Sequence, residues 1–541
     1  MRIRKRNNLK KKNSAIVILF LTPLIGFLGV GSVAIYIIYD INSFTYELKP
    51  PDTDQFYELD DINMTLLEEM ALIYDFRNMN LHSPSGFPVD ITFKNRSYTF
   101  NAIDYWHHTD NGGAHSSYAL AAACYKYKTA LIMGDEELLI NATREVKYFV
   151  KAYAKLIAAP NGGLGINPDT GEYYPGIIAR FACSYQDAKQ YHPFMLEDHV
   201  RHHNGTGIYK NWRIRLKTSR DEVCGLYLGW ASVLKFIDPE VNEDSKWCVE
   251  QVRTMVDQVL HHWMKESNWL VLDYDGAPTG SDINTPPWKL IALRIGATAF
   301  PEKYESLYKY VASKSLQLNG ATMGGLSNVG MEYFALLGAV KSMFPLILLE
   351  DNSDLRYHYI KNFEKNFYKM VRYHRNAFFN IVHLILIEML DKDQRAYLEN
   401  EEYDMDCVRW DVLDQLWRFH ASNWCPIRNY NLTERPHSTR STSLNPDLRK
   451  KVVDPTREKW LDFFENHPMG WMYAWMEDIF KMDTQIYELP STISEHWAHH
   501  MIWQSNPFQK EGGDPEGDGL TESPGTSFTM VYWLGRAFEI F

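Results

Sequence analysis

The chain has 541 residues, of which 45% are hydrophobic and 14% aromatic, and this composition excludes a generally disordered chain. The formal net charge is −12, although the first 12 residues are strongly basic, so the rest of the chain is more acidic still. This balance argues against a polyanionic partner such as nucleic acid. The 16 Trp and 33 Tyr residues fit either a large core or a cleft in which flat rings stack on sugars.

The N-terminus predicts a membrane anchor. Residues 1–13 form a basic tail, and residues 14–39 contain no charged side chain over a length that can cross a bilayer as a helix. The basic flank should stay cytoplasmic, which places the remainder outside the cell. A cleaved signal peptide is the alternative, but the apolar run is long for one and ends without a clear cleavage site. We therefore expect a single-pass protein of the cell membrane.

The remainder divides into a polar stalk over residues 40–62 and an extracellular domain over residues 63–541. Five N-x-S/T sequons are compatible with an extracellular glycoprotein, and they lie at Asn63, Asn95, Asn141, Asn204 and Asn431. No two of the six cysteines form a C-x-x-C pair, which argues against a zinc ribbon or a thioredoxin motif. An even number of cysteines outside the cell allows disulfides, but their pairing is not readable from the sequence.

Apolar residues spaced three and four apart predict a domain made of helices. The predicted helices are at 64–76, 117–133, 136–157, 222–237, 246–264, 287–300, 302–316, 331–349, within 355–390, and at 407–421, 457–466 and 470–482. Only residues 89–100 alternate as strands do. Long loops are expected at 161–181, 268–287, 429–455 and 503–526, where function often concentrates. About twelve helices could form six helical hairpins closed into a ring, an all-α fold.

The stretch SRDEVCGLYLGW begins at Ser219 and matches the capping box S-x-x-E. In that pattern Ser219 caps a helix and Glu222 bonds back to the Ser219 amide. The pattern leaves Arg220 and Asp221 less fully explained, so they are candidates for chemistry. Gly225 and Gly229 lie four apart on the same helix, which predicts close packing or close approach of a ligand.

The run YWHHTDNGG, which begins at Tyr105 and includes Trp106, places Asp110 in a Gly-rich loop before a helix. A carboxylate there can act as a general acid or base, with His108 and His115 on either side. An Asx-turn that leads into the helix explains the same residues equally well. The histidine spacing matches no standard zinc site.

The loop NPDTGEYYPGIIARF contributes Tyr174 and Arg180. Arg180 could bind a carboxylate or a sulfate of a substrate with two parallel hydrogen bonds, or it could form an ordinary surface ion pair.

Other motifs give little support for a metal or a nucleotide. His496 and His500 lie four apart, but they lack the Glu of H-E-x-x-H. The acids of EGGDPEGDG could bind Ca²⁺, although a solvated loop explains them as well. P-loop, G-x-G-x-x-G, G-x-S-x-G and kinase motifs are absent from the sequence. We expect no cofactor.

The order of DNGG, PGIIARF, SRDEVCGLYLGW and LDYDGAPTG resembles that of the six-hairpin glycosidase-like proteins, which include unsaturated glucuronyl hydrolases and related polysaccharide-processing proteins. The resemblance covers roughly residues 104–280. It implies an (α/α)6 toroid in which Asp residues at the inner helix ends serve as general acid and base. In this sequence Asp110 and Asp221 stand in comparable settings.

These observations predict a membrane-anchored extracellular glycoside hydrolase with Asp110 and Asp221 as its catalytic pair and a glycan as its substrate. The predicted substrate-binding residues are His108, His115, Arg180, Arg220, Tyr174 and Trp106. One alternative is a polysaccharide lyase, whose base would be assisted by His108, Arg180 or Arg220. Others are a glycan-binding or surface scaffold protein without activity and a membrane-bound maturation factor for exported proteins.

Overall fold

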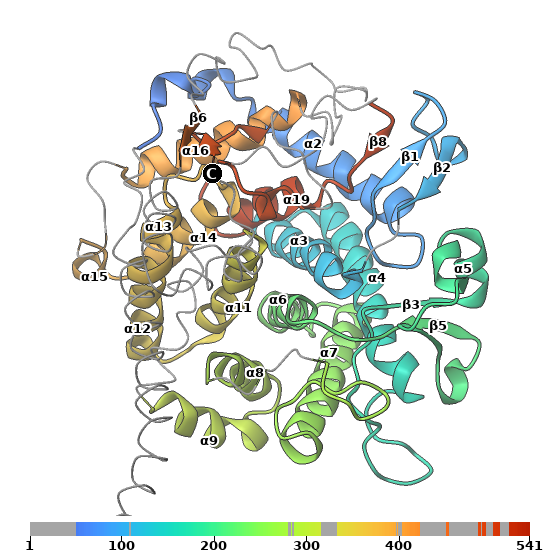
Figure 1. Cartoon of the computed structure of the whole chain (residues 1–541). Helices are drawn as coiled ribbons and strands as arrows, with labels where there is room; N and C mark the ends of the chain where they lie inside the picture. The colour runs from blue at the N-terminus through green and yellow to red at the C-terminus, as the bar shows by residue number, and fades with distance from the viewer. Residues whose placement is uncertain are drawn as a thin grey trace, which may run out of the picture. The chain divides into compact units, whose positions relative to one another are not determined.

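The computed structural model (Figure 1) describes residues 50–107, 110–279, 283, 286–314, 333–396, 398, 403–421, 451–453, 485–487, 489–493, 501–508 and 519–541. The chain divides into two compact units, and the elements analysed below belong to the larger one, made of residues 49–324, 332–452 and 485–541. The predicted tail and anchor and the helices predicted at 457–466 and 470–482 lie outside the described residues. In the part of the chain that is described, no helix combines the length and the apolar character needed to cross a membrane.

Helices dominate the described chain, which confirms the all-α class. They are α2 (Met64–Arg77), α3 (Gly112–Met133), α4 (Glu136–Asn161), α5 (Tyr185–Gln190), α6 (Arg220–Phe236), α7 (Glu243–His261), α8 (Pro286–Ala299), α9 (Pro301–Ala312), α11 (Phe334–Leu349), α12 (Ser353–Phe363), α13 (Lys369–Val371), α14 (Ala377–Glu388), α15 (Lys392–Ala396), α16 (Met405–Arg418) and α19 (Thr526–Ala537). Most predicted helices agree with these to within a turn.

Two differences from the predicted helices have local causes. The run predicted within 355–390 is not continuous, because Arg375 adopts a left-handed φ of 53° between α13 and α14. A residue in that conformation ends a helix. The sequence analysis also missed α19, which follows directly on the loop expected at 503–526 and whose residues are almost all buried.

Polar side chains mark where several helices begin. Asn63 accepts from the amides of Thr65 and Leu66 at the start of α2, and Asp135 accepts from the Leu138 amide at the start of α4. Asn242 does the same at the start of α7. Each side chain satisfies amides that have no partner inside the helix, and this fixes the starting residue.

The helices pack in pairs that are mostly close in the sequence, except that α2 pairs with the distant α19, and the pairs also contact one another. The contacting pairs are α2–α19, α3–α4, α6–α7, α8–α9, α11–α12 and α14–α16. Further contacts join α3 to α6 and α19, α11 to α6 and α8, and α14 to α19. Figure 1 shows α6 nearly end-on, with α3, α7, α8 and α11 around it.

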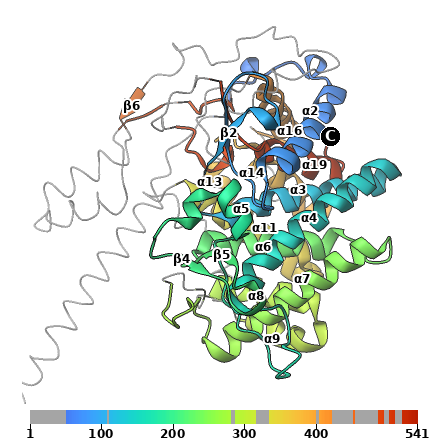
Figure 2. The same cartoon turned by 90° about the vertical axis from the view of Figure 1, so that its right-hand side faces the viewer.

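Short strands form small antiparallel sheets. They are β1 (Ile91–Phe93), β2 (Ile103–Trp106), β3 (Phe181–Ser184), β4 (His202–Asn204), β5 (Trp212–Arg215), β6 (Lys451–Val453), β7 (Gln485–Tyr487) and β8 (Thr521–Glu522). One sheet has the order β2–β1–β8 and another β3–β5–β4. Strands were predicted only over residues 89–100, near the first sheet. Figure 2 shows β2, β4 and β5 toward one end of α3 and α4.

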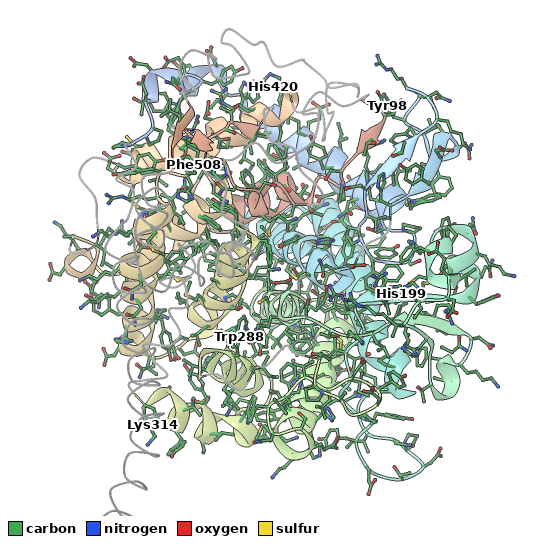
Figure 3. All side chains as sticks on the ribbon, viewed as in Figure 1. Tyr98, His199, Trp288, Lys314, His420 and Phe508 are labelled. Atoms are coloured by element: carbon green, nitrogen blue, oxygen red, sulfur yellow. The ribbon has the colours of Figure 1, made fainter. Side chains whose placement is uncertain are left out.

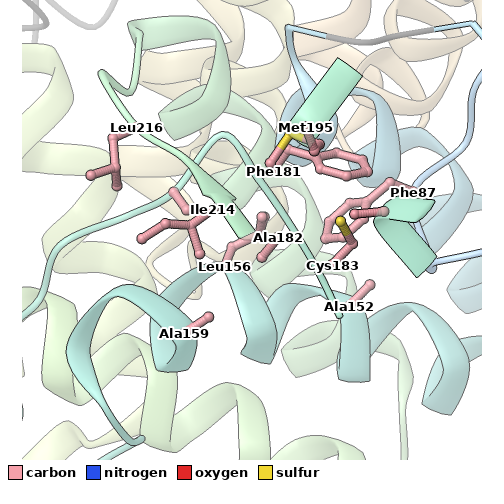
Figure 4. Close-up of a cluster of buried hydrophobic side chains, with 12 residues drawn as sticks. Phe87, Ala152, Leu156, Ala159, Phe181, Ala182, Cys183, Met195, Ile214 and Leu216 are labelled. Atoms are coloured by element: carbon pink, nitrogen blue, oxygen red, sulfur yellow. The ribbon is translucent and has the colours of Figure 1, made fainter. Parts of the chain in front are cut away.

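An apolar cluster fastens the β3–β5–β4 sheet to α4 (Figure 4). Phe181 and Ile214 of the sheet are buried together with Leu156 and Ala152 of α4 and Phe87. The sheet is therefore a fixed platform, and the segments at its strand ends are held against the start of α3.

The end of the predicted stalk packs onto α16. Phe56 and Tyr57 are fully buried. The Tyr57 amide donates to Asp414 over 2.8 Å, and Arg418 donates to the carbonyl oxygen of Gln55 over 2.7 Å. These residues therefore belong to the folded unit rather than to a free linker.

A buried ion cluster joins four helices. The Lys126 ammonium of α3 lies 3.0 Å from Asp75 of α2 and 2.9 Å from Glu145 of α4, and Trp533 of α19 also donates to Asp75. Burial raises the pKa of both carboxyls, to about 7 for Glu145, and Lys126 partly offsets the increase. The cluster therefore depends on its single cation.

Replacing Lys126 with methionine should lower the free energy of unfolding by about 3–5 kcal/mol, because two buried carboxyls lose their cation. Chemical denaturation measures the loss. Lys151→Met is the control, since Lys151 is exposed on α4, and its effect should stay below about 1 kcal/mol. Equal losses in the two variants would contradict a structural role for the cluster.

The cysteines that the structure describes do not form the disulfides that the sequence allowed. Among the described residues, Cys124, Cys183, Cys224, Cys248 and Cys407 are free thiols. The remaining Cys425 lies outside the described residues.

Candidate functional site

The first turns of α3 and α6 meet at what we call the α3–α6 junction, made of residues 110–114, Arg180, Arg215 and residues 219–222. Gly113 lies so close to Glu222 that a Cβ atom there would stand 2.5 Å from the Glu222 Oε2 atom. A Cβ on Gly112 would stand 2.6 Å from the carbonyl oxygen of Arg180. The DNGG sequence is therefore needed for close approach at the start of α3.

The structure corrects the predicted capping box. Ser219 does occupy the N-cap position of α6, but its side chain makes no capping hydrogen bond. The Glu222 carboxylate instead reaches the neighbouring helix, where its Oε2 atom accepts from the Ala114 amide over 3.1 Å. That amide has no partner within its own helix, and the helix dipole favours a carboxylate there. Glu222 thus joins two helices rather than capping its own.

Glu222 is fully buried. Burial raises its pKa to about 8 and the charge of Asp221 adds to the increase, while Arg180, Lys341 and the Ala114 amide oppose it. The side chain is therefore largely protonated at neutral pH. Its Oε1 atom has no hydrogen-bond partner among the described residues. This role of Glu222 was not predictable from the sequence, because the S-x-x-E pattern is explained by local structure.

The Arg180 side chain makes internal hydrogen bonds rather than a surface ion pair. The side chain is buried, and its donors reach the carbonyl oxygens of Asp110 and Lys217 and the Asn111 side-chain oxygen. Lys217 holds a left-handed φ of 63°, which turns the chain just before α6. Arg180 therefore connects the start of β3 to the starts of both helices.

Asp110 faces the β3–β5–β4 sheet. Its carboxylate pairs with Arg215 of β5 and lies 3.9 Å from the Arg201 guanidinium, while 43% of its side chain stays exposed. Figure 3 labels His199 on this side of the structure, near β3 and β5. Of the two predicted catalytic residues, Asp110 is thus held by cations on the sheet, and Asp221 is half-buried on α6 beside Glu222.

The other predicted site residues lie in different settings. His115 is buried in α3 and Arg220 is exposed at the start of α6. The Trp106 indole donates to the Leu81 carbonyl oxygen and its ring packs on Tyr191, while the Tyr174 ring lies against Gly163. None of these contacts brings Trp106 or Tyr174 to Asp110. His108, His496, His500 and residues 511–518 of the loop EGGDPEGDG lie outside the described residues.

Within the described ranges, no group of three His, Cys, Asp or Glu side chains could hold a metal ion. The junction holds a protonated carboxyl, Glu222, next to the carboxyl of Asp221 in the same helix. Two more polar atoms of the junction, Ser219 Oγ and Arg215 Nε, are buried without a hydrogen-bond partner among the described residues. Buried polar atoms are normally paired with protein groups or with ordered water, so these atoms are open to a hydrogen-bond partner that the described residues do not supply.

Gly225 sets how closely the two helices approach. A Cβ there would lie 2.7 Å from the Ala114 Cα atom and 2.9 Å from the Gly113 carbonyl oxygen, and a Cβ on Gly229 would meet the Tyr153 ring. The close packing predicted for Gly225 and Gly229 is therefore confirmed. The Tyr153 hydroxyl lies 3.0 Å from the Gly113 carbonyl oxygen and 3.1 Å from that of Gly225, which fastens α4 to the same contact.

Replacing Gly225 with alanine should lower the free energy of unfolding by about 1–3 kcal/mol or more, because the methyl group meets backbone atoms. Gly338→Ala is the matched control, since Gly338 also lies within a helix but its Cβ would come no closer than 3.8 Å to Cys224. That variant should be neutral or gain up to about 1 kcal/mol. Equal effects of the two substitutions on thermal unfolding would show that the helix contact is not tight.

The comparisons with known proteins leave the resemblance in the sequence as a prediction: no family model matches the chain, and neither a curated protein nor a solved structure matches it.

Proposed function

We propose that the protein hydrolyses glycosidic bonds at the α3–α6 junction. The observation that carries the proposal is the Glu222 carboxyl, which is protonated near neutral pH and has one oxygen without a partner among the described residues. Glycoside hydrolysis requires one protonated and one ionised carboxyl across the bond. Glu222 would supply the proton from Oε1, and Asp110, balanced by Arg215, would act as the carboxylate.

This assignment gives Asp221 a different part from the one predicted from the sequence. Asp221 adjoins Glu222 in α6, and its negative charge helps to hold the proton on Glu222. Asp221 would then set the protonation of the acid rather than donate the proton itself.

The proposed architecture is an (α/α)6 toroid. It is supported by the six contacting helix pairs and by the contacts of α19 with α3 and α14, which would close the ring. In that arrangement the starts of α3 and α6 lie at the same end of neighbouring inner helices. The proposed setting is an extracellular domain of a single-pass membrane protein with a glycan as its partner.

The test is a glycan-degradation screen with the full chain and four variants. Glu222→Gln and Asp110→Asn should each lower the rate by about 10²–10⁴-fold, the usual contribution of a general acid or base. Asp221→Asn should shift the pH dependence of cleavage, and the exposed Asp169→Asn should leave the rate unchanged.

The products separate the alternatives. Products with a new carbon–carbon double bond would replace hydrolysis with the lyase reaction. Glycan binding without cleavage would favour the glycan-binding or scaffold protein. Full activity in both Glu222→Gln and Asp110→Asn would overturn the site assignment.

A further inference from the structure

Four of the five N-x-S/T sequons lie in the part of the chain that the structure describes, and they differ in local structure. The sequon of Asn63 runs into α2, that of Asn141 lies within α4 and that of Asn204 begins at the end of β4. Among these four, only the sequon of Asn95 lies wholly outside helices and strands. An enzyme that modifies a folded chain must draw the target segment into its own site, and a loop opens at a lower cost than a helix or a sheet.

The Asn95 sequon forms an exposed turn between β1 and β2. Asn95, Arg96 and Ser97 are all exposed. The Asn95 Oδ1 atom accepts from the Ser97 amide over 3.0 Å, and the Ser97 hydroxyl lies 3.2 Å from that of Thr99. The first bond holds the third residue of the sequon close to the asparagine side chain and uses only the oxygen of that side chain. The Nδ2 atom, to which an N-linked sugar is attached, takes no part in it.

Two buried rings hold the ends of this turn. Phe93 precedes the turn in β1 and Tyr98 follows it, and their rings meet edge-on with centres 5.3 Å apart. The Tyr98 hydroxyl donates to the carbonyl oxygen of Gly519 over 2.9 Å. The exposed residues 94–97 therefore stand out from a fixed base.

Two of the other sequons have their third residue engaged in the fold. In the α4 sequon, Thr143 is buried and its hydroxyl donates to the Leu139 carbonyl oxygen over 2.8 Å. In the β4 sequon, the Thr206 hydroxyl donates to the Pro160 carbonyl oxygen over 2.8 Å. The hydroxyl of the third residue is part of the acceptor motif. Each of these sequons must therefore lose a hydrogen bond, and part of its helix or sheet, before it can be modified.

The sequon of Asn63 is the closest rival of the Asn95 sequon. The Asn63 Oδ1 atom accepts from the Thr65 amide over 2.9 Å, which is the same turn bond that Asn95 forms. Thr65, however, lies in the first turn of α2, and the same oxygen also accepts from the Leu66 amide as the cap of that helix. Modification there requires the helix start to unwind, whereas Asn95 requires only its own turn to open.

We propose that Asn95 is an N-glycosylation site and that the folded chain is modified there in preference to the three other described sequons. The donor is an oligosaccharide joined to a lipid through a diphosphate. The anomeric carbon of its first sugar forms a bond to the Asn95 Nδ2 atom, and the bond from that carbon to the diphosphate breaks. The lipid diphosphate leaves with the electron pair, and the amide nitrogen loses one proton. Modification in the cell rests on the extracellular setting proposed above, whereas the preference among sequons rests on the fold.

The test incubates the folded full chain with a single-subunit oligosaccharyltransferase and a lipid-linked oligosaccharide, and follows each sequon by peptide mapping. Asn95 should be modified faster than the three other described sequons by about tenfold or more, because helices and sheets open less often than loops. Ser97→Ala should abolish modification of Asn95. The matched control Thr99→Ala, at the exposed hydroxyl beside Ser97, should leave it unchanged. Equal rates at the four described sequons, or an unmodified Asn95, would overturn the proposal.

Short peptides that each carry one sequon measure the preference of the transferase for the sequence alone. The preference for Asn95 in the folded chain should exceed the preference for its peptide by about tenfold. An equal preference in chain and peptides would mean that the fold does not select Asn95, and it would defeat the proposal.

Expression of the full chain in cells with a secretory N-glycosylation pathway tests the setting. A sequon appended after Phe541 reports whether the C-terminal part of the chain is exported. Modification of both the appended sequon and Asn95 supports the proposal, and a modified tag beside a bare Asn95 overturns it. A bare tag would defeat only the extracellular setting, because the purified chain still decides the preference for Asn95. None of these outcomes depends on glycan cleavage at the α3–α6 junction.

Discussion

Replacing Glu222 with glutamine should make the protein more resistant to alkaline conditions. The pKa of Glu222 is about 8 in the folded protein, compared with the ordinary value of 4.5 that applies to the unfolded chain. The contribution of Glu222 to stability is complete below about pH 4.5 and is lost as the pH rises through about 8. Over this range the unfolded protein releases the Glu222 proton, whereas the folded protein either keeps it or buries a charged carboxylate. Glutamine does not titrate, so the variant escapes this loss.

The size of the effect follows from the pKa shift. Each unit corresponds to about 1.4 kcal/mol, so the stability of wild type should fall by several kcal/mol relative to Glu222→Gln between pH 4.5 and 8. Urea denaturation at intervals of one pH unit measures the difference. Glu145 titrates in the same range, but it is present in both proteins and cancels. Glu172→Gln, at an exposed site, should give no such difference. Parallel curves for wild type and Glu222→Gln would show that Glu222 is not held protonated.

Replacing Arg180 with methionine should destabilise the junction by about 3–5 kcal/mol, the usual cost of leaving buried partners of a charged group unpaired. The carbonyl oxygens of Asp110 and Lys217 and the Asn111 side chain would lose their donor. Arg180 is also the strongest of the groups that lower the pKa of Glu222. Without Arg180, the pH at which the folded protein loses the Glu222 proton should therefore move above 8.

Chemical denaturation at pH 6 and at pH 9 separates these two effects of Arg180. Arg201→Met is the control: Arg201 lies 3.9 Å from the carboxylate of Asp110, the residue whose carbonyl oxygen Arg180 binds, but 36% of the Arg201 side chain is exposed, so the loss should stay within about 1 kcal/mol. A small effect of Arg180→Met, equal to that of Arg201→Met, would show that Arg180 does not hold the helix starts together.

Much of the local structure could be predicted from the sequence because it depends on near neighbours. The start of α6 after Ser219 could be predicted because a run of polar residues is followed there by apolar residues at helical spacing. Gly225 and Gly229 stand where an alanine would favour the helix, so their presence alone indicated a close contact. The strands missed at β3, β4 and β5 are three or four residues long, too short for an alternating pattern.

The candidate site shows where such reasoning stops. The sequence by itself determined most of the helices to within about a turn, and the presence of carboxyls near the starts of α3 and α6. The sequence pattern assigned Glu222 to a capping box with the Ser219 amide, because that amide is the nearest partner for Glu222 at the start of its own helix. Only the tertiary structure decided that Glu222 turns to the Ala114 amide, that Arg180 donates to internal acceptors and that Lys341 of α11 lies over the Tyr118 ring. The reason is physical: burial and charge at one atom depend on what other helices bring near it, and the order of residues along the chain does not record those neighbours.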